Sequence, residues 1–308
     1  MKILITGCRG FIGSSFGHYA HAAGHETLGV SRSSQAPHGW PGHYVASDVA
    51  TFNLTEIIER FQPELVFHAA GSASVSRSLN QPFEDLQASL MTWANTLDGI
   101  RRSGVRPMIV LPSSAAIYGN SNSLPISEMS PIAPISPYGF HKAACEWIGR
   151  EYAECFGLPI LICRIFSVFG PNQRRLLLWE IYEQLQSTAS NLNLQGTGRE
   201  SRDYLAVDDL SAAVLKMVTR PKSIFQENNL VTVNLASGVE SPIIDLATQI
   251  RDWLAPEKTI TCRGQSRMGD PTRWVADVSL LHKLTEGWTP QPLSISLHNC
   301  LRVWKGDN

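Results

Sequence analysis

Three side chains in the middle of the chain could together transfer a proton: Ser114, Tyr138 and Lys142. Tyr138 and Lys142 are four residues apart in the segment SPYGFHK, so on a helix they share one face, one turn apart. A lysine ammonium beside a phenol favours the phenolate, which can exchange a proton with a substrate hydroxyl. Ser114 ends the segment IVLPSS and can hold the substrate oxygen as its charge changes. These residue types predict proton transfer at an alcohol or a ketone.

A glycine-rich turn near the N-terminus could bind the carrier of a hydride. The chain begins MKILITGCRGFIG, an apolar strand that runs into Gly7, Gly10 and Gly13. Glycines at this spacing permit a tight turn and let the backbone approach a pyrophosphate closely. The free N–H groups of the following helix, which starts at Phe11 and Ile12, would face the phosphates. The segment therefore predicts a dinucleotide site, and with it a nicotinamide cofactor.

The residues after the second expected strand bear on the choice of cofactor. An NAD site normally has an acidic side chain there, which accepts from the ribose 2′-hydroxyl. This chain has Ser31, Arg32 and Ser33 instead. A guanidinium can hold a 2′-phosphate through paired hydrogen bonds, so we expect NADP, with NAD as the alternative. If Arg32 is only a solvated loop residue, this expectation fails.

Further cofactor contacts are expected from residues at the ends of the later strands and from the catalytic helix. We expect His68 to be structural rather than catalytic. The residues concerned are Asp48, Val49, His68, Ala69, Ala70, Tyr138 and Lys142.

Composition limits the class of protein. The chain has 308 residues, 43% of them hydrophobic and 17% charged, which is typical of a globular protein with a domain and a smaller lobe. A net charge of -1 gives no electrostatic reason to bind nucleic acid or an anionic membrane. None of the six cysteines forms a C-x-x-C pair, which indicates reduced thiols and no metal site. The first apolar run is too short for a signal peptide, so we expect a cytoplasmic protein.

Strand and helix patterns alternate over the first half of the chain, which predicts an α/β protein with a doubly wound parallel sheet. We expect residues 1–170 to form the NAD(P)-binding domain, with a strand near 231–235 returning to it, and residues 171–308 to form mainly a substrate-binding lobe. The expected strands are residues 2–6, 26–30, 64–68, 107–111 and 159–164, and the expected helices are 11–23, 54–61, 82–103 and 138–156. Residues 31–44 and 120–137 are expected to be loops.

Several motifs, in order along nearly the whole chain, resemble the extended short-chain dehydrogenase/reductase family in its nucleotide-sugar epimerase/dehydratase branch. They are TGCRGFIG, FHAAG, PSSAAIYG, SPYGFHK, CRIFSVFGP, SRDYLAVDDL and RMGDP. The resemblance implies a Rossmann-type fold, a catalytic trio of Ser114, Tyr138 and Lys142, and a nucleoside-diphosphate sugar in the C-terminal lobe. It further implies that Arg202 and Arg267 grip the diphosphate, two forked cations for a dianion. Ser167, which replaces the family's usual asparagine, is implied to contact the substrate.

Departures from the family pattern narrow the reaction. Ala115 and Ala116 stand where 4,6-dehydratases carry an Asp–Glu pair, so simple dehydration is disfavoured. Our leading hypothesis is NADPH-dependent reduction of a 4-keto sugar. The alternative is a nucleotide-sugar 4-epimerase that retains its NAD(P). Further alternatives are a non-sugar alcohol dehydrogenase of the same superfamily and an NADP-sensing protein without chemistry.

Two expected helices carry apolar residues on more than one face. The helix from Pro82 includes Phe83, Leu86, Leu90 and Trp93. As in relatives, that pattern suits burial against a second copy through a four-helix contact, and we expect a homodimer.

Overall fold

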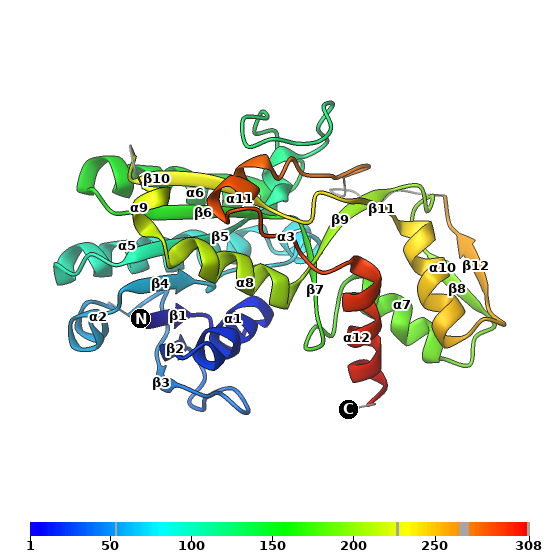
Figure 1. Ribbon diagram of the computed structural model, residues 1–308, viewed down its shortest axis with the longest axis horizontal. Coiled ribbons are helices and arrows are strands. Elements are labelled where there is room, and N and C mark those ends of the chain that lie inside the picture. The colour runs from blue at the N-terminus through cyan, green and yellow to red at the C-terminus, as the bar shows by residue number, and fades with distance from the viewer. Residues whose placement is uncertain (53, 226–227, 265–270, 307–308) are drawn as a thin grey trace.

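A parallel sheet forms the centre of the molecule. The computed structural model describes residues 1–52, 54–225, 228–264 and 271–306. Within them, seven strands make one parallel sheet in the order β10-β6-β5-β4-β1-β2-β3 (Figure 1). The strands are β1 Lys2–Thr6, β2 Glu26–Ser31, β3 His43–Ala46, β4 Leu65–His68, β5 Met108–Ser114, β6 Ile160–Ile165 and β10 Leu230–Leu235. The expected α/β fold with a doubly wound parallel sheet is confirmed.

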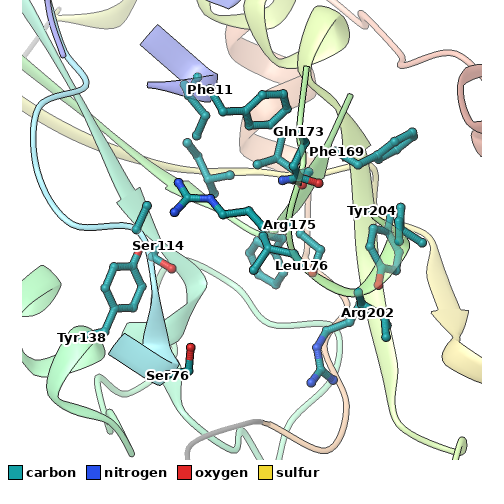
Figure 2. Close-up of a pocket in the computed structure, with 18 of the residues that line it drawn as sticks. Phe11, Ser76, Ser114, Tyr138, Phe169, Gln173, Arg175, Leu176, Arg202 and Tyr204 are labelled. Atoms are coloured by element: carbon teal, nitrogen blue, oxygen red, sulfur yellow. Dashed lines mark hydrogen bonds between the residues drawn. The ribbon is translucent and has the colours of Figure 1, made fainter. Parts of the chain in front are cut away.

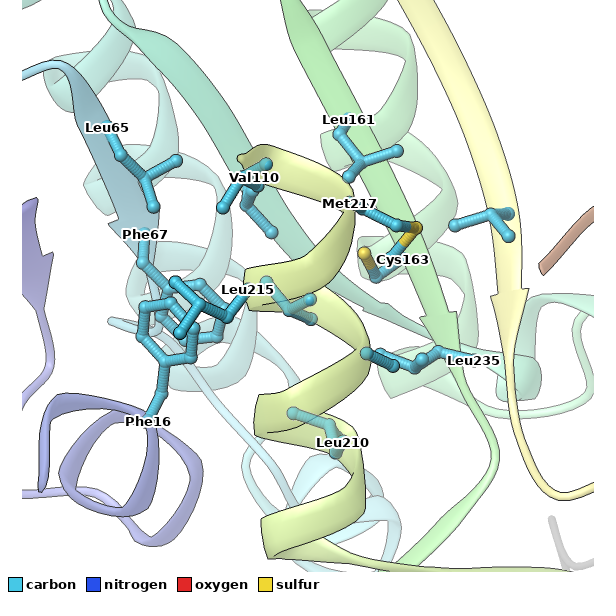
Figure 3. Close-up of a cluster of buried hydrophobic side chains, with 14 of the residues drawn as sticks. Phe16, Leu65, Phe67, Val110, Leu161, Cys163, Leu210, Leu215, Met217 and Leu235 are labelled. Carbon is cyan, nitrogen blue, oxygen red and sulfur yellow. The ribbon is translucent and has the colours of Figure 1, made fainter. Parts of the chain in front are cut away.

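Helices cover both faces of this sheet, which is why its strands are apolar on both sides. They are α1 Phe11–Ala22, α2 Thr55–Phe61, α3 Val75–Asn80, α4 Pro82–Leu86, α5 Thr92–Ser103, α6 Pro137–Phe156, α8 Val207–Val218, α9 Pro221–Ile224 and α11 Ser279–Leu284. Successive strand residues point to opposite faces. Ile3 and Ile5 therefore pack with α1 and α8, whereas Leu4 packs with α2 and α5. On the first face, Phe16 of α1 stacks on Phe67 of β4 with ring centroids 4.1 Å apart (Figure 3).

The catalytic helix α6 has defined ends. Pro137 occupies its first turn, where a missing N–H costs nothing, and the Ser136 hydroxyl accepts from the N–H of Gly139. At the other end the chain leaves the helix at Gly157, with a φ of 67° that favours glycine. These two signals hold the register of α6, and so fix where Tyr138 and Lys142 lie.

The remaining elements form a smaller lobe beside the sheet (Figure 1). It holds a three-stranded sheet of β7 Ser167–Phe169, β9 Ser201–Ala206 and β11 Glu240–Pro242, and a parallel pair of β8 Asn191–Leu194 and β12 Thr259–Cys262. Its helices are α7 Leu177–Gln186, α10 Ile243–Leu254 and α12 Leu293–Lys305. The chain crosses between the two parts more than once, because α8 and β10 belong to the large sheet although they follow β7.

Two elements differ from the sequence expectation. Residues 82–103 do not form one regular helix: between α4 and α5 lies a π-helical turn, Gln87–Met91. Just after this turn, the Thr92 hydroxyl donates to the carbonyls of Ala88 and Ser89, which competes with the regular helical pattern. Strand β3 lies largely in what we expected to be a loop. It is short and sits at the sheet edge, so it has no buried apolar run for a pattern to detect.

Candidate active site

One large cavity lies where the carboxyl ends of the central strands meet the smaller lobe. Its volume is about 760 Å³. In the sheet order, β1 and β4 leave in opposite directions, and ligands of such sheets bind at that point. The cavity reaches from the glycine-rich turn, past Ser114 and Tyr138, to Arg202 in the lobe (Figure 2). It could therefore hold a cofactor and a substrate end to end.

The glycine-rich turn fits the phosphates of a dinucleotide. A Cβ on Gly7 would lie 2.5 Å from the carbonyl oxygen of Ala69, and one on Gly13 would lie 2.6 Å from that of Gly7. Only glycine allows this close approach of turn, strand and helix. Helix α1 has no side-chain cap, and Phe11, Ile12 and Gly13 line the cavity. The first N–H groups of α1 are thus placed to meet an anion there.

The three expected catalytic side chains converge on this cavity. Ser114 is the last residue of β5, and Figure 2 shows the Tyr138 phenol pointing toward it. The Ser114 Oγ accepts a hydrogen bond from the Ala116 N–H at 3.2 Å, so its own proton remains available to a ligand. Lys142 is nearly buried: its Nζ donates to the Pro112 carbonyl at 3.1 Å and lies 5.7 Å from the centroid of the Tyr138 ring.

A buried ion pair supports this trio from behind. Arg164 of β6 lies beside Ser113 in the sheet and bonds the Glu146 carboxylate, with 2.7 Å between Nη2 and Oε2. Ser113 donates to the same carboxylate at 2.5 Å, and Glu146 lies one turn after Lys142 on α6. Arg164 also donates to the Tyr118 hydroxyl at 2.9 Å. Burial raises the pKa of Tyr118 to about 12, so this second phenol stays protonated.

His68 lines the cavity but is held as a neutral ring. Burial, and then the charge of Lys142, lower its pKa to about 3. Its Nδ1 lies 2.9 Å from the Thr6 hydroxyl and 3.1 Å from that of Thr96. Because Thr96 donates its own proton to the carbonyl of Thr92, the imidazole proton belongs on Nδ1. A ring so fixed is a wall of the site rather than a general acid, in line with the structural role expected for it.

The residues expected to bind the adenosine half lie beyond the lining of this cavity. The Ser31 hydroxyl lies 3.0 Å from that of Tyr44, and Arg32 is exposed. The Asp48 carboxylate accepts from the N–H of Ala50 at 3.0 Å and so closes a turn, while Val49 is buried. By contrast, Ala69 and Ala70 do line the cavity beside the turn. Cofactor contacts of all these residues stay predictions.

The expected substrate residues are placed in part. Ser167 opens β7 and Arg202 lies on β9, and both line the cavity. The Arg202 Nη1 donates to the carbonyl of Ser201 at 2.8 Å, and its guanidinium lies 5.6 Å from the Trp274 ring centroid. Arg267, which the resemblance pairs with Arg202, falls outside the described residues.

Sequence reasoning missed a further cation in the cavity. Arg175 lines it from the loop between β7 and α7, and in Figure 2 its guanidinium points toward the space between Phe11 and Ser114. The next residue, Leu176, has a φ of 71°, which is unusual for a side chain with a Cβ and marks a tightly constrained loop. The repeated arginines after FGP were the signal, but no pattern told which of them would turn inward.

The family model that matches is described as the NAD dependent epimerase/dehydratase family, and it covers residues 3–236. The chain belongs to this family. UDP-glucose 4-epimerase of Mycolicibacterium smegmatis is 28% identical to it over 303 residues, which are 94% of each chain. Two solved structures share its fold. MoeE5 in complex with UDP-glucuronic acid and NAD has a TM-score of 0.87 at 22% identity and covers 100% of both chains. TunA, an NAD dependent NDP-hexosamine 5,6-dehydratase, has a TM-score of 0.88 at 25% identity and covers 100% of this chain and 99% of its own.

These relatives confirm the family inferred from the motifs: the chain is an enzyme of the extended short-chain dehydrogenase/reductase family. They support the leading hypothesis only in part. Reduction of a 4-keto sugar has no support among the relatives named here, and epimerisation is the better supported reaction. NAD is the cofactor named for the neighbours, so a preference for NADP stays a prediction. No helix in the described part of the chain is long and apolar enough to cross a membrane.

Proposed function

We propose that this member of the epimerase/dehydratase family is a nucleoside-diphosphate-sugar 4-epimerase. The observation that carries the proposal is the chemistry beside Ser114. The two residues that follow it are Ala115 and Ala116, buried methyl groups, so no carboxylate stands there to remove and deliver a proton during elimination. Among the described lining residues, the carboxylates are those of Glu180 and Glu200, both in the lobe. The reacting end is thus equipped for one reversible proton exchange.

In this reaction Tyr138 takes the proton of the sugar C4 hydroxyl, while Ser114 donates a hydrogen bond to the same oxygen. The bound nicotinamide dinucleotide supplies the hydride chemistry: it accepts the hydrogen of C4 as hydride and returns it. Lys142, held by the Pro112 carbonyl, keeps its ammonium beside the Tyr138 ring and stabilises the phenolate. Between the two transfers the 4-keto sugar presents its other face to the cofactor. Tyr138 then returns the proton, and no net oxidation results.

Arginines support an anionic substrate. Arg202 at the lobe and Arg175 at the middle of the cavity can both meet the substrate diphosphate, and Arg267 is proposed to join them from outside the described residues. A nucleoside diphosphate bound in the lobe would leave its sugar between Ser114 and Tyr138. UDP is the first base to test, because the relatives named above include a UDP-glucose epimerase and a complex with UDP-glucuronic acid.

For the cofactor, we propose NADP over NAD. The end of β2 carries Ser31 and Arg32 instead of an acid, and a guanidinium suits a 2′-phosphate. Retained NADP would serve an epimerase as well as NAD, since the hydride comes back within each turnover. The same feature favours the second candidate function, net reduction of a 4-keto sugar by NADPH.

One experiment separates the two functions. The protein is given UDP-hexoses with a catalytic amount of cofactor, and products are resolved by NMR. Epimerase activity converts substrate to its 4-epimer over many turnovers without consuming the cofactor, whereas a reductase consumes one NADPH per product. Tyr138→Phe should lower kcat by about 10² to 10⁴, the range for a positioned acid–base. Tyr152→Phe, on the same helix, is the control. Conversion that survives Tyr138→Phe, or a product lacking water, contradicts the proposal.

We also propose that the protein is a homodimer. Helix α4 and helix α6 pack together and expose large apolar side chains, among them Phe83, Phe140 and Trp147, each at least 60% exposed. Phe140 and Trp147 are seven residues apart, two helical turns, and so lie on one stripe of α6. A second copy bringing the same two helices would cover this stripe in a four-helix contact.

A further inference from the structure

Arg9 has a place in the glycine-rich turn that its motif alone does not explain. Its neighbour Cys8 is fully buried, whereas Arg9 is exposed. The Arg9 guanidinium leaves the turn and reaches the segment that follows β2, where Nη1 donates to the carbonyl of Gln35 at 2.8 Å and to that of Ala36 at 3.1 Å. These bonds use one of its three nitrogens. The rest of the guanidinium stays free beside the segment that begins with Arg32.

Arg32 is presented by a fixed backbone. The Tyr44 hydroxyl donates to the carbonyl of Ser33 at 2.5 Å, and because its proton is used there, it accepts from the Ser31 hydroxyl at 3.0 Å. Tyr44 of β3 therefore holds the residues on both sides of Arg32. The Arg32 side chain itself is exposed and has no partner in the described part of the chain. Its conformation leaves the guanidinium for a ligand or solvent.

The surroundings favour an anion. Between Glu26 and Asp48 the sequence has no carboxylate, although this is the stretch where an NAD site places its acid. Asp48 itself is turned to the N–H of Ala50. The Ser31 hydroxyl, which stands at the acid's position, is already engaged with Tyr44. Two free cations with no carboxylate in this stretch are poorly suited to bare ribose hydroxyls and well suited to a phosphate.

We propose that Arg9 and Arg32 together bind the 2′-phosphate of NADP, Arg9 from the glycine-rich turn and Arg32 from the end of β2. The inference deepens the cofactor preference proposed above and needs neither the sugar nor the reaction. The bonds from Arg9 to the carbonyls of residues 35 and 36 tie the two cations to one loop. Binding of the phosphate would thus order the loop and the turn together.

The test uses two fragments that differ by this one phosphate. Calorimetry measures the dissociation constants of 2′,5′-ADP and 5′-AMP for the whole protein. The wild type should bind 2′,5′-ADP at least about tenfold more tightly, the effect of charge-assisted bonds to a phosphate. Arg9→Ala and Arg32→Ala should each reduce this ratio by about tenfold or to near one, and the double variant should show no preference. Affinity for 5′-AMP should change little in all of them.

Controls separate a ligand from a structural support. Arg9→Lys keeps the charge and should retain part of the preference, while Arg175→Ala, in the catalytic cavity, should leave the ratio unchanged. The ratio should also fall with added salt and below about pH 6, where the phosphate loses its second charge. If Arg9→Ala weakens both fragments equally, Arg9 only braces the loop and the proposal is wrong. A wild-type ratio near one also overturns it, and would remove the NADP preference while leaving the proposed epimerase intact.

Discussion

Tyr118 and Tyr138 show how the surroundings of a phenol decide its use. Tyr138 faces the cavity, with a lysine ammonium 5.7 Å from its ring, and can exchange a proton with a ligand. Tyr118 is fully buried, donates to Asn234 at 2.7 Å, and has its pKa raised to about 12 by burial. The same side chain is therefore a catalyst in one place and a structural hydrogen-bonding group in the other.

His68 makes stability depend on pH. Burial lowers its pKa to about 3 in the folded protein, while in the unfolded chain it should titrate near 6.5. Below about pH 6.5 the unfolded state binds the extra proton, so the free energy of unfolding falls as the pH drops toward 3. Denaturant unfolding at about pH 7 and pH 5 measures this loss. His68→Gln should flatten the pH dependence, whereas His43→Gln, at an exposed strand residue, should not. An unchanged slope in His68→Gln would refute the assignment.

At the scale of elements, the ion pair of Glu146 and Arg164 joins α6 to β6 behind the catalytic residues. Both side chains are 7% exposed. Removing one partner leaves the other charge buried without compensation, so Glu146→Gln should lower the free energy of unfolding by about 3 to 5 kcal/mol. Chemical denaturation measures it.

The same helix offers a matched control. Glu154→Gln breaks the exposed pair of Arg150 and Glu154, and should change stability by about 0.5 kcal/mol or less. Similar losses in the two variants would mean that burial does not set the strength of these pairs. Since Glu146 also accepts from Ser113, next to Ser114, a fall in kcat beyond the loss of folded protein would show that the pair positions the active site.

For the whole molecule, the stripe on α4 and α6 predicts the oligomeric state. Trp147→Glu places a charge at the centre of the proposed contact, and should convert a dimer to a monomer in light scattering at micromolar concentration. The control is Trp253→Glu, an exposed tryptophan on α10 of the lobe. If the wild type is itself a monomer, or if both variants remain dimers, the four-helix contact is wrong.

The sequence by itself determined the features that depend on neighbouring residues. The glycine spacing from Gly7 to Gly13, the four-residue step from Tyr138 to Lys142 and the alternation of strands and helices are local, and each has a direct geometric meaning. The trio could be predicted to meet because the ends of parallel strands share one edge of the sheet. The extent of the π-helical turn and the short strand β3 could not, since each depends on hydrogen bonds rather than on an apolar pattern.

Only the tertiary structure decided which distant residues came together. Nothing near Arg164 in the sequence points to Glu146, and their pairing follows from the packing of α6 on the sheet. The same holds for Arg175, which a loop turns into the cavity, and for Arg9, which reaches the backbone of Gln35 and Ala36. Long, flexible cations can point in many directions from one backbone position. Their partners are therefore set by the folded surroundings, and not by the spacing of residues along the chain.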